Sequence, residues 1–145
     1  MKRITLIFIL ISSALFANSQ NSMDHSKMNH TTTAKSGMAY HNEMATRDGF
    51  SVSIHSKKTF VNGNNEVEIM ILNGGKIVQN ADVKIKFFMP EMPGTPYMEY
   101  EDKGKLTNGV FKANINLSMN GTWQYQIRFR TEDTKIRMVK GSINY

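Results

Sequence analysis

Apolar and polar residues alternate one by one in short runs from residue 50 onward, and this pattern limits the folds open to the chain. In residues 82–87, for example, Val83, Ile85 and Phe87 alternate with one acidic and two basic side chains. A period of two indicates a β-strand with one face buried and the other in water. The runs predicted to be strands are residues 50–54, 67–71, 82–87, 111–117, 123–129 and 135–143.

Short segments containing Asn, Asp or Gly separate these runs, and no long segment has the 3.6-residue period of an amphipathic helix. Six or seven short strands with regularly spaced turns predict an all-β fold, an antiparallel sandwich. Residues 108–131 are predicted to form a hairpin closed at residues 118–121. We expect Trp123 at the centre of the core.

The N-terminus has the parts of a secretory signal peptide. Lys2 and Arg3 precede an apolar run over residues 4–15, and small residues follow at 17–19. A membrane anchor needs about 20 apolar residues, so the alternative of an uncleaved anchor fits less well. We therefore predict a signal peptide at residues 1–19, no membrane span after its cleavage, and a periplasmic or secreted protein.

Net charge and cysteine content limit the classes of ligand that the protein is expected to bind. The formal net charge of +6 falls to +4 when Lys2 and Arg3 are removed, and no basic cluster remains that would follow a nucleic-acid backbone. The chain has no Cys. The fold must therefore depend on its hydrophobic core, and a soft metal would have to be bound by Met and His, which do not form disulfides.

Residues 20–46 are rich in polar residues, His and Met, and nearly lack branched apolar residues. Such a segment buries too little surface to offset its ordering entropy, so we predict a disordered tail before a folded domain at 47–145. Packing does not explain methionines in a polar tail. The tail residues predicted to be metal ligands are Met23, His25, Met28, His30, Met38, His41 and Met44.

Two units in the tail place a thioether two residues from an imidazole, at Met23 and His25 and again at Met28 and His30. Residues i and i+2 of an extended chain project to the same side, so each unit could close on one ion. Thioether and imidazole together favour copper(I), with silver(I) as a mimic, while imidazole also suits copper(II) or zinc. The alternative is a linker that carries these residues incidentally.

A second group of candidate ligands, Met89, Met92 and Met98, lies in a loop that contains all three prolines of the chain. Proline restricts φ, so we predict a stiff loop that presents its thioethers as a soft-metal site or a partner-binding surface. Alternatively, Met89 and Met98 fill the end of the core. His55, at a strand end, is predicted to be an ordinary surface residue.

Motifs of common enzyme classes are missing from the sequence. It has no Cys nucleophile, no G-x-S-x-G, no H-E-x-x-H and no glycine-rich phosphate loop, and its acidic residues are dispersed. We therefore expect no enzymatic activity.

Four motifs follow one another in the second half of the chain. They are A-D-V-K-I at 81–85, M-P-E-M-P-G at 89–94, G-V-F-K-A at 109–113 and L-S-M-N-G-T-W at 117–123. In this order they resemble the FixH-like/YtkA-like domain family. The M-D-H unit of the tail is similar instead to repeats in periplasmic copper and silver resistance proteins.

The resemblance implies an exported or membrane-anchored immunoglobulin-like β-sandwich, here of about seven strands. Several members of the family are linked to copper delivery or heavy-metal efflux. The resemblance also implies that Met89 and Met92, with Met119 at a nearby turn, form the distinctive end of the domain. FixH proteins proper keep a membrane helix, which this chain is predicted to lose.

Two functional hypotheses follow. The first is an extracytoplasmic copper-handling protein that binds copper(I) or silver(I) for delivery, homeostasis or efflux. The second is a metal-independent module that docks onto a membrane efflux or oxidase-assembly complex through its Met-Pro surface, because methionine-rich surfaces also adapt to protein partners.

Overall fold

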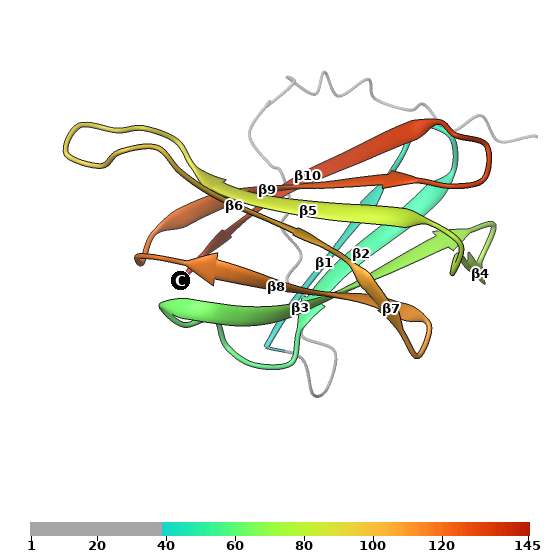
Figure 1. Cartoon of the computed structure of the whole chain (residues 1–145), viewed down its shortest axis with the longest axis horizontal. Helices are drawn as coiled ribbons and strands as arrows, with labels where there is room; N and C mark the ends of the chain where they lie inside the picture. The colour runs from blue at the N-terminus through green and yellow to red at the C-terminus, as the bar shows by residue number, and fades with distance from the viewer. Residues whose placement is uncertain (1–38) are drawn as a thin grey trace, which may run out of the picture.

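The computed structural model describes residues 39–145, and all regular secondary structure in that range is β-strand. The ten strands form two antiparallel sheets that pack as a sandwich (Figure 1). The strands are β1 (Tyr40–Ala45), β2 (Phe50–Ser56), β3 (Gly63–Asn73), β4 (Lys76–Ile77), β5 (Asp82–Met89), β6 (Met98–Lys103), β7 (Lys105–Thr107), β8 (Val110–Leu117), β9 (Thr122–Arg130) and β10 (Ile136–Asn144).

The first sheet has the order β1-β2-β3-β8-β7, with β4 paired to β3. The second has the order β10-β9-β5-β6. The chain passes from the second sheet to the first at Gly104, between β6 and β7. A Cβ on Gly104 would lie 3.0 Å from the Cβ of Phe111 and 3.3 Å from that of Val83, so the close approach of the two sheets there favours glycine.

Alternating residues from the inner faces of both sheets fill the core, as the sequence predicts. Trp123 is buried with Phe87, Tyr125 and Phe129 from the second sheet against Phe111 from the first. The outer face of the second sheet carries the alternate charged residues, with Lys84 opposite Arg128 in the register. The predicted all-β antiparallel sandwich is confirmed.

All six predicted runs are strands, and four further strands were not predicted: β1, β4, β6 and β7. One pairing was wrong. Residues 110–117 and 122–130 do not form a hairpin, because β8 pairs with β3 and β7 while β9 pairs with β5 and β10. The turn at 118–121 instead carries the chain from one sheet to the other. The sequence of a turn is alike whether it closes a hairpin or connects two sheets, so the sequence did not distinguish them.

The expectation of a flexible segment through residue 46 also needs correction. Residues 40–45 form β1, which pairs along its whole length with β2, from Tyr40 opposite Ser56 to Ala45 opposite Ser51. The predicted signal peptide and residues 20–38 lie outside the described residues. None of the described residues forms a helix of the length and hydropathy needed to cross a bilayer.

Candidate functional site

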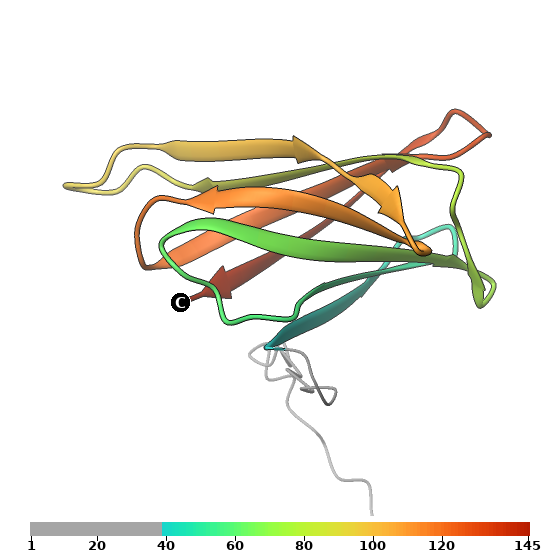
Figure 2. The ribbon, with the colours of Figure 1, turned by 60° about the horizontal axis from the view of Figure 1, so that its bottom comes forward.

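The Met-Pro loop forms the end of a long hairpin between β5 and β6. Met89 ends β5 and lies opposite Met98, the first residue of β6. Figures 1 and 2 show that this hairpin projects beyond the ends of the neighbouring strands. The paired strands therefore place the methionine-bearing segment at one extreme of the molecule.

A tight turn closes the tip of the hairpin. The amide of Met92 donates to the carbonyl of Thr95 at 2.9 Å, and the amide of Thr95 donates back at 2.8 Å. Pro93 and Gly94 occupy the two central positions, and Gly94 has φ +81°. This is the arrangement of a type II turn, which suits proline and glycine in that order. The tip is therefore defined by its own backbone, in agreement with the predicted stiff loop.

The three methionines of the hairpin have different environments. Met89 is 1% exposed and belongs to the core, as the packing alternative predicts. Met98 is partly buried against the core. Met92 is 51% exposed at the tip. Met92 therefore presents a free thioether, and Met98 lies within reach of the surface, whereas Met89 would have to leave the core to bind an ion.

The turn between β8 and β9 lies at the same end of the sandwich. The hydroxyl of Ser118 donates to the sulfur of Met98 at 3.2 Å, and a Cβ on Gly121 would lie 3.1 Å from the methyl group of Met89. Met119, in the same turn, is 37% exposed. We call the three surface-reaching methionines, Met92, Met98 and Met119, the methionine end.

The backbone of Met119 is held in place by two donors. The indole of Trp123 donates to its carbonyl at 3.0 Å, and the hydroxyl of Tyr145 donates to the same oxygen at 2.7 Å. The side chain of Met119 is consequently displayed from a fixed backbone beside the projecting hairpin.

A charged pair stiffens the outer face of the hairpin. The hydroxyl of Tyr97 donates to Oε2 of Glu99 at 2.6 Å, and Nζ of Lys86 lies 3.2 Å from the same oxygen. The hydrogen bond to Glu99 raises the pKa of Tyr97, and the hydrogen bonds from Tyr97 and Lys86 lower the pKa of Glu99. Both groups keep their ordinary charge states near neutral pH.

Two of the predicted tail ligands lie within β1, on opposite faces of the strand. Met44 faces inward, with its sulfur 3.8 Å from the hydroxyl of Tyr125. His41 faces the other way and lies opposite His55. The two side chains therefore do not converge on one ion. The remaining predicted tail ligands, Met23, His25, Met28, His30 and Met38, lie outside the described residues.

His55 is not the surface residue that was expected. It is 4% exposed and its Nε2 lies 2.7 Å from Oε2 of Glu68, which is itself 5% exposed. Sequence reasoning missed both residues. His55 lies at the end of its run, where the alternation does not assign it to either face, and Glu68 occupies an outward position of an apolar strand. The sequence carried no clear signal for this pair, because alternation does not show which strands lie side by side.

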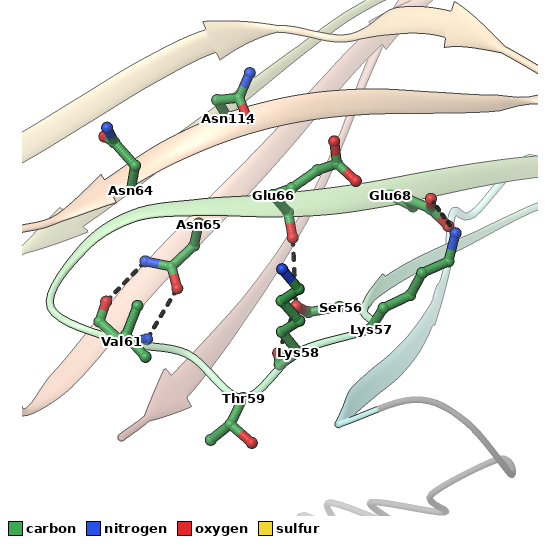
Figure 3. Close-up of a pocket in the computed structure, with 10 residues that line it drawn as sticks. All are labelled: Ser56, Lys57, Lys58, Thr59, Val61, Asn64, Asn65, Glu66, Glu68 and Asn114. Atoms are coloured by element: carbon green, nitrogen blue, oxygen red, sulfur yellow. Dashed lines mark hydrogen bonds and ion pairs between the residues drawn. The ribbon is translucent and has the colours of Figure 1, made fainter.

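Glu68 also lines a polar pocket of about 510 Å³ beneath the segment that joins β2 to β3 (Figure 3). Asn65 fixes the wall of this pocket by accepting from the amide of Val61 at 2.9 Å and donating to its carbonyl at 2.8 Å. Lys57 reaches Oε1 of Glu68 at 2.8 Å. The pocket is open, and both of its carboxylates are already paired, Glu68 with Lys57 and Glu66 with Lys112.

Within residues 39–145, no group of three or more His, Asp or Glu side chains is arranged to hold a metal ion. The grouped sulfur and nitrogen donors among the described residues are the thioethers of the methionine end and the imidazoles of His41 and His55.

A family model described as YtkA-like matches residues 44–128, which is more than half of the chain. This chain belongs to the YtkA-like family. The match starts within β1 and ends within β9, so it covers His55, Glu68 and the whole methionine end, and it confirms the YtkA-like part of the expected resemblance. YtkA-like domains are associated with extracytoplasmic proteins. No curated protein and no solved structure matches the chain.

Proposed function

We propose that this YtkA-like protein binds copper(I) outside the cytoplasm, in the periplasm or after secretion, and passes it on in metal delivery, homeostasis or efflux. The observation that carries the proposal is the methionine end, where a projecting hairpin and the adjacent turn bring Met92, Met98 and Met119 to one end of the sandwich. The metal ion is the cargo, and silver(I) would bind as a mimic.

The chemistry of the donors supports a soft, monovalent ion. A thioether is neutral and polarisable, it carries no proton to displace, and it suits copper(I) better than magnesium or calcium. Binding by Met98 would break its hydrogen bond from Ser118, which is a weak interaction. Met89 would remain in the core and support the hairpin.

The N-terminal sequence supports the extracytoplasmic location and a capture role for the tail. The signal peptide predicted at residues 1–19 directs export. The Met- and His-bearing residues after it would bind ions and deliver them to the methionine end, since ligands on the same chain have a high local concentration at the second site.

A second candidate function is docking of the same end onto a membrane efflux or oxidase-assembly protein without metal. Next to Met92, which is half-exposed, Tyr97 and Tyr100 are also exposed on the hairpin. Aromatic and methionine side chains are enriched in protein interfaces. A pull-down that recovers the same partner equally with and without a copper(I) chelator would favour this function.

A copper(I) competition titration tests the first proposal. The parent is the full chain with Met23→Leu, Met28→Leu, Met38→Leu, His25→Gln and His30→Gln, so that tail ligands do not mask the domain. We expect Met92→Leu, Met98→Leu and Met119→Leu together to weaken binding at least about tenfold, because Leu keeps the volume and removes the sulfur.

Met138→Leu is the matched control, since Met138 is also exposed but lies on β10, away from the hairpin. It should leave the affinity unchanged. Equal affinity in the parent and the triple variant would contradict a copper(I) site at the methionine end.

A further inference from the structure

A row of three polar side chains crosses the outer face of the first sheet. His41 on β1 lies opposite His55 on β2, and His55 lies opposite Glu68 on β3. The core-facing positions of β1 are occupied by its neighbours Tyr40 and Asn42, which reach Tyr125. The two imidazoles and the carboxylate therefore share one face, on three adjacent strands.

Glu68 orients the ring of His55. Its Oε2 lies 2.7 Å from Nε2 of His55, while Lys57 and Lys112 contact Oε1 at 2.8 and 3.1 Å. Burial raises the pKa of Glu68, but the hydrogen bonds from Lys57, Lys112 and His55 outweigh it and lower the pKa to about 2. A carboxylate ionised at neutral pH accepts a hydrogen bond from the N–H of Nε2, so Nδ1 is the nitrogen of His55 that is available to a metal.

His41 has a nitrogen without a partner. Its Nδ1 is buried and makes no hydrogen bond within the described part of the chain. A buried polar atom left unsatisfied costs about 1–3 kcal/mol, so such an atom in a folded protein calls for an explanation. The ring centroid of His41 lies 6.4 Å from that of His55, with the ring planes inclined by 39°.

We propose that His41 and His55 bind one copper(II) ion on the outer face of the first sheet, with Glu68 as the residue that positions His55. A metal lies about 2 Å from an imidazole nitrogen, so two rings that face each other across it are roughly 6 to 6.5 Å apart. The observed centroid distance of 6.4 Å falls within this range. Among divalent first-row metals, copper(II) binds nitrogen ligands most tightly, and water completes its coordination.

The arrangement of Glu68 and His55 matches the way in which proteins support metal-binding histidines. A carboxylate that accepts the second ring N–H fixes the tautomer and raises the basicity of the ligand. The negative charge of Glu68 also offsets the positive charge of Lys57 and Lys112 near the ion. The site uses nitrogen ligands and a divalent ion, and it depends on neither the methionine end nor copper(I).

The histidine content of the chain makes a direct test possible. There are four histidines, so the full chain with His25→Gln and His30→Gln retains only His41 and His55. Copper(II) is added to this parent, and pulsed electron paramagnetic resonance counts the imidazoles bound to it. We expect two imidazoles in the parent, one in the His41→Gln variant, and about a tenfold or greater loss of affinity in that variant.

Glu68→Gln tests the positioning role. It keeps the shape of the side chain but loses its charge, and we expect two bound imidazoles with affinity lower by about tenfold. Because His55 is buried, thermal unfolding is used to check that each variant still folds. If His55→Gln does not fold, His41→Gln, on the edge strand, still tests the site. One imidazole or none in the parent, or an unchanged spectrum in His41→Gln, would overturn the proposal.

Discussion

Tyr125 shows how closely single residues are matched across the strands. Its ring covers Gly141, its register partner on β10. Its hydroxyl accepts from Nδ2 of Asn42 at 2.6 Å and lies 3.2 Å from the hydroxyl of Tyr40. Burial, together with the neighbouring Tyr40, raises the pKa of Tyr125 well above its ordinary value, so the phenol stays neutral.

The first prediction concerns Gly141→Ala. A Cβ at this position would overlap the ring and hydroxyl of Tyr125, so the ring must move and disturb its hydrogen bonds. Overpacking of this kind should lower the free energy of unfolding by about 1–3 kcal/mol, which urea denaturation would measure as a lower midpoint. Ser142→Ala on the outward side of β10 is the control and should change it by less than about 0.5 kcal/mol. Equal stability of the two variants would contradict the packing described.

At the scale of elements, β1 is attached to the sandwich by more than its pairing with β2. Tyr40 donates to the carbonyl of Ser142 at 3.2 Å, and Asn42 donates to Tyr125, so this edge strand of the first sheet is tied to the second. Polar residues make these links, and they explain why a segment with few apolar residues is ordered.

The second prediction is that Asn42→Ala loosens β1 selectively. Loss of its hydrogen bond costs about 0.5–1.5 kcal/mol, and most of that cost falls on opening of the edge strand. Hydrogen exchange should therefore accelerate for amides of residues 40–45 while those of β9 change little. Glu43→Gln, on the exposed face of β1, is the matched control. Uniform acceleration in both strands would show instead that β1 unfolds only with the whole domain.

At the scale of the whole molecule, Arg137 joins the β1–β2 loop to the β9–β10 loop, at the end of the sandwich opposite the projecting hairpin (Figure 1). Its guanidinium contacts Asp48, between β1 and β2, at 2.6 Å and Asp133, between β9 and β10, at 2.5 Å. It also lies 4.2 Å from the ring centroid of Phe50. Planar guanidinium suits this combination of two carboxylates and an aromatic ring.

The third prediction is acid lability that depends on this cluster. Hydrogen bonds from Thr46 and Arg137 lower the pKa of Asp48 from 3.8 to about 2, and hydrogen bonds from Arg137 and Thr131 lower that of Asp133. A carboxyl whose pKa is lower in the folded state stabilises it above the unfolded pKa. The contribution is therefore complete above about pH 4 and is lost as the pH falls toward 2.

Urea midpoints measured between pH 2 and pH 7 check this dependence. Arg137→Met should lower stability at neutral pH and make the loss between pH 4 and 2 shallower. Glu68, whose pKa is also about 2, would supply part of the remaining slope. Arg128→Met, on the outer face of the second sheet, should leave the slope unchanged. A slope in Arg137→Met as steep as in the parent would refute this role for the cluster.

The sequence predicted some elements of the structure better than others. Alternation located all six long runs and their inward faces, including Trp123, because burial of one face of a strand leaves a period of two in the sequence. It did not locate β6 or β7, where charged and polar residues predominate on edge strands. Nor did it identify the partners of β8 and β9, since alternation reports which face is buried and not which strand lies alongside.

The candidate sites divide in the same way. The sequence by itself determined that soft donors gather around the Met-Pro loop and that proline and glycine stiffen it. Only the tertiary structure placed the turn that carries Met119 against Met98, left Met89 in the core, and lined up His41, His55 and Glu68 on neighbouring strands. Local residue types determine propensity and donor chemistry, whereas contacts between residues distant in the chain depend on strand register, which is fixed when the two sheets pack together.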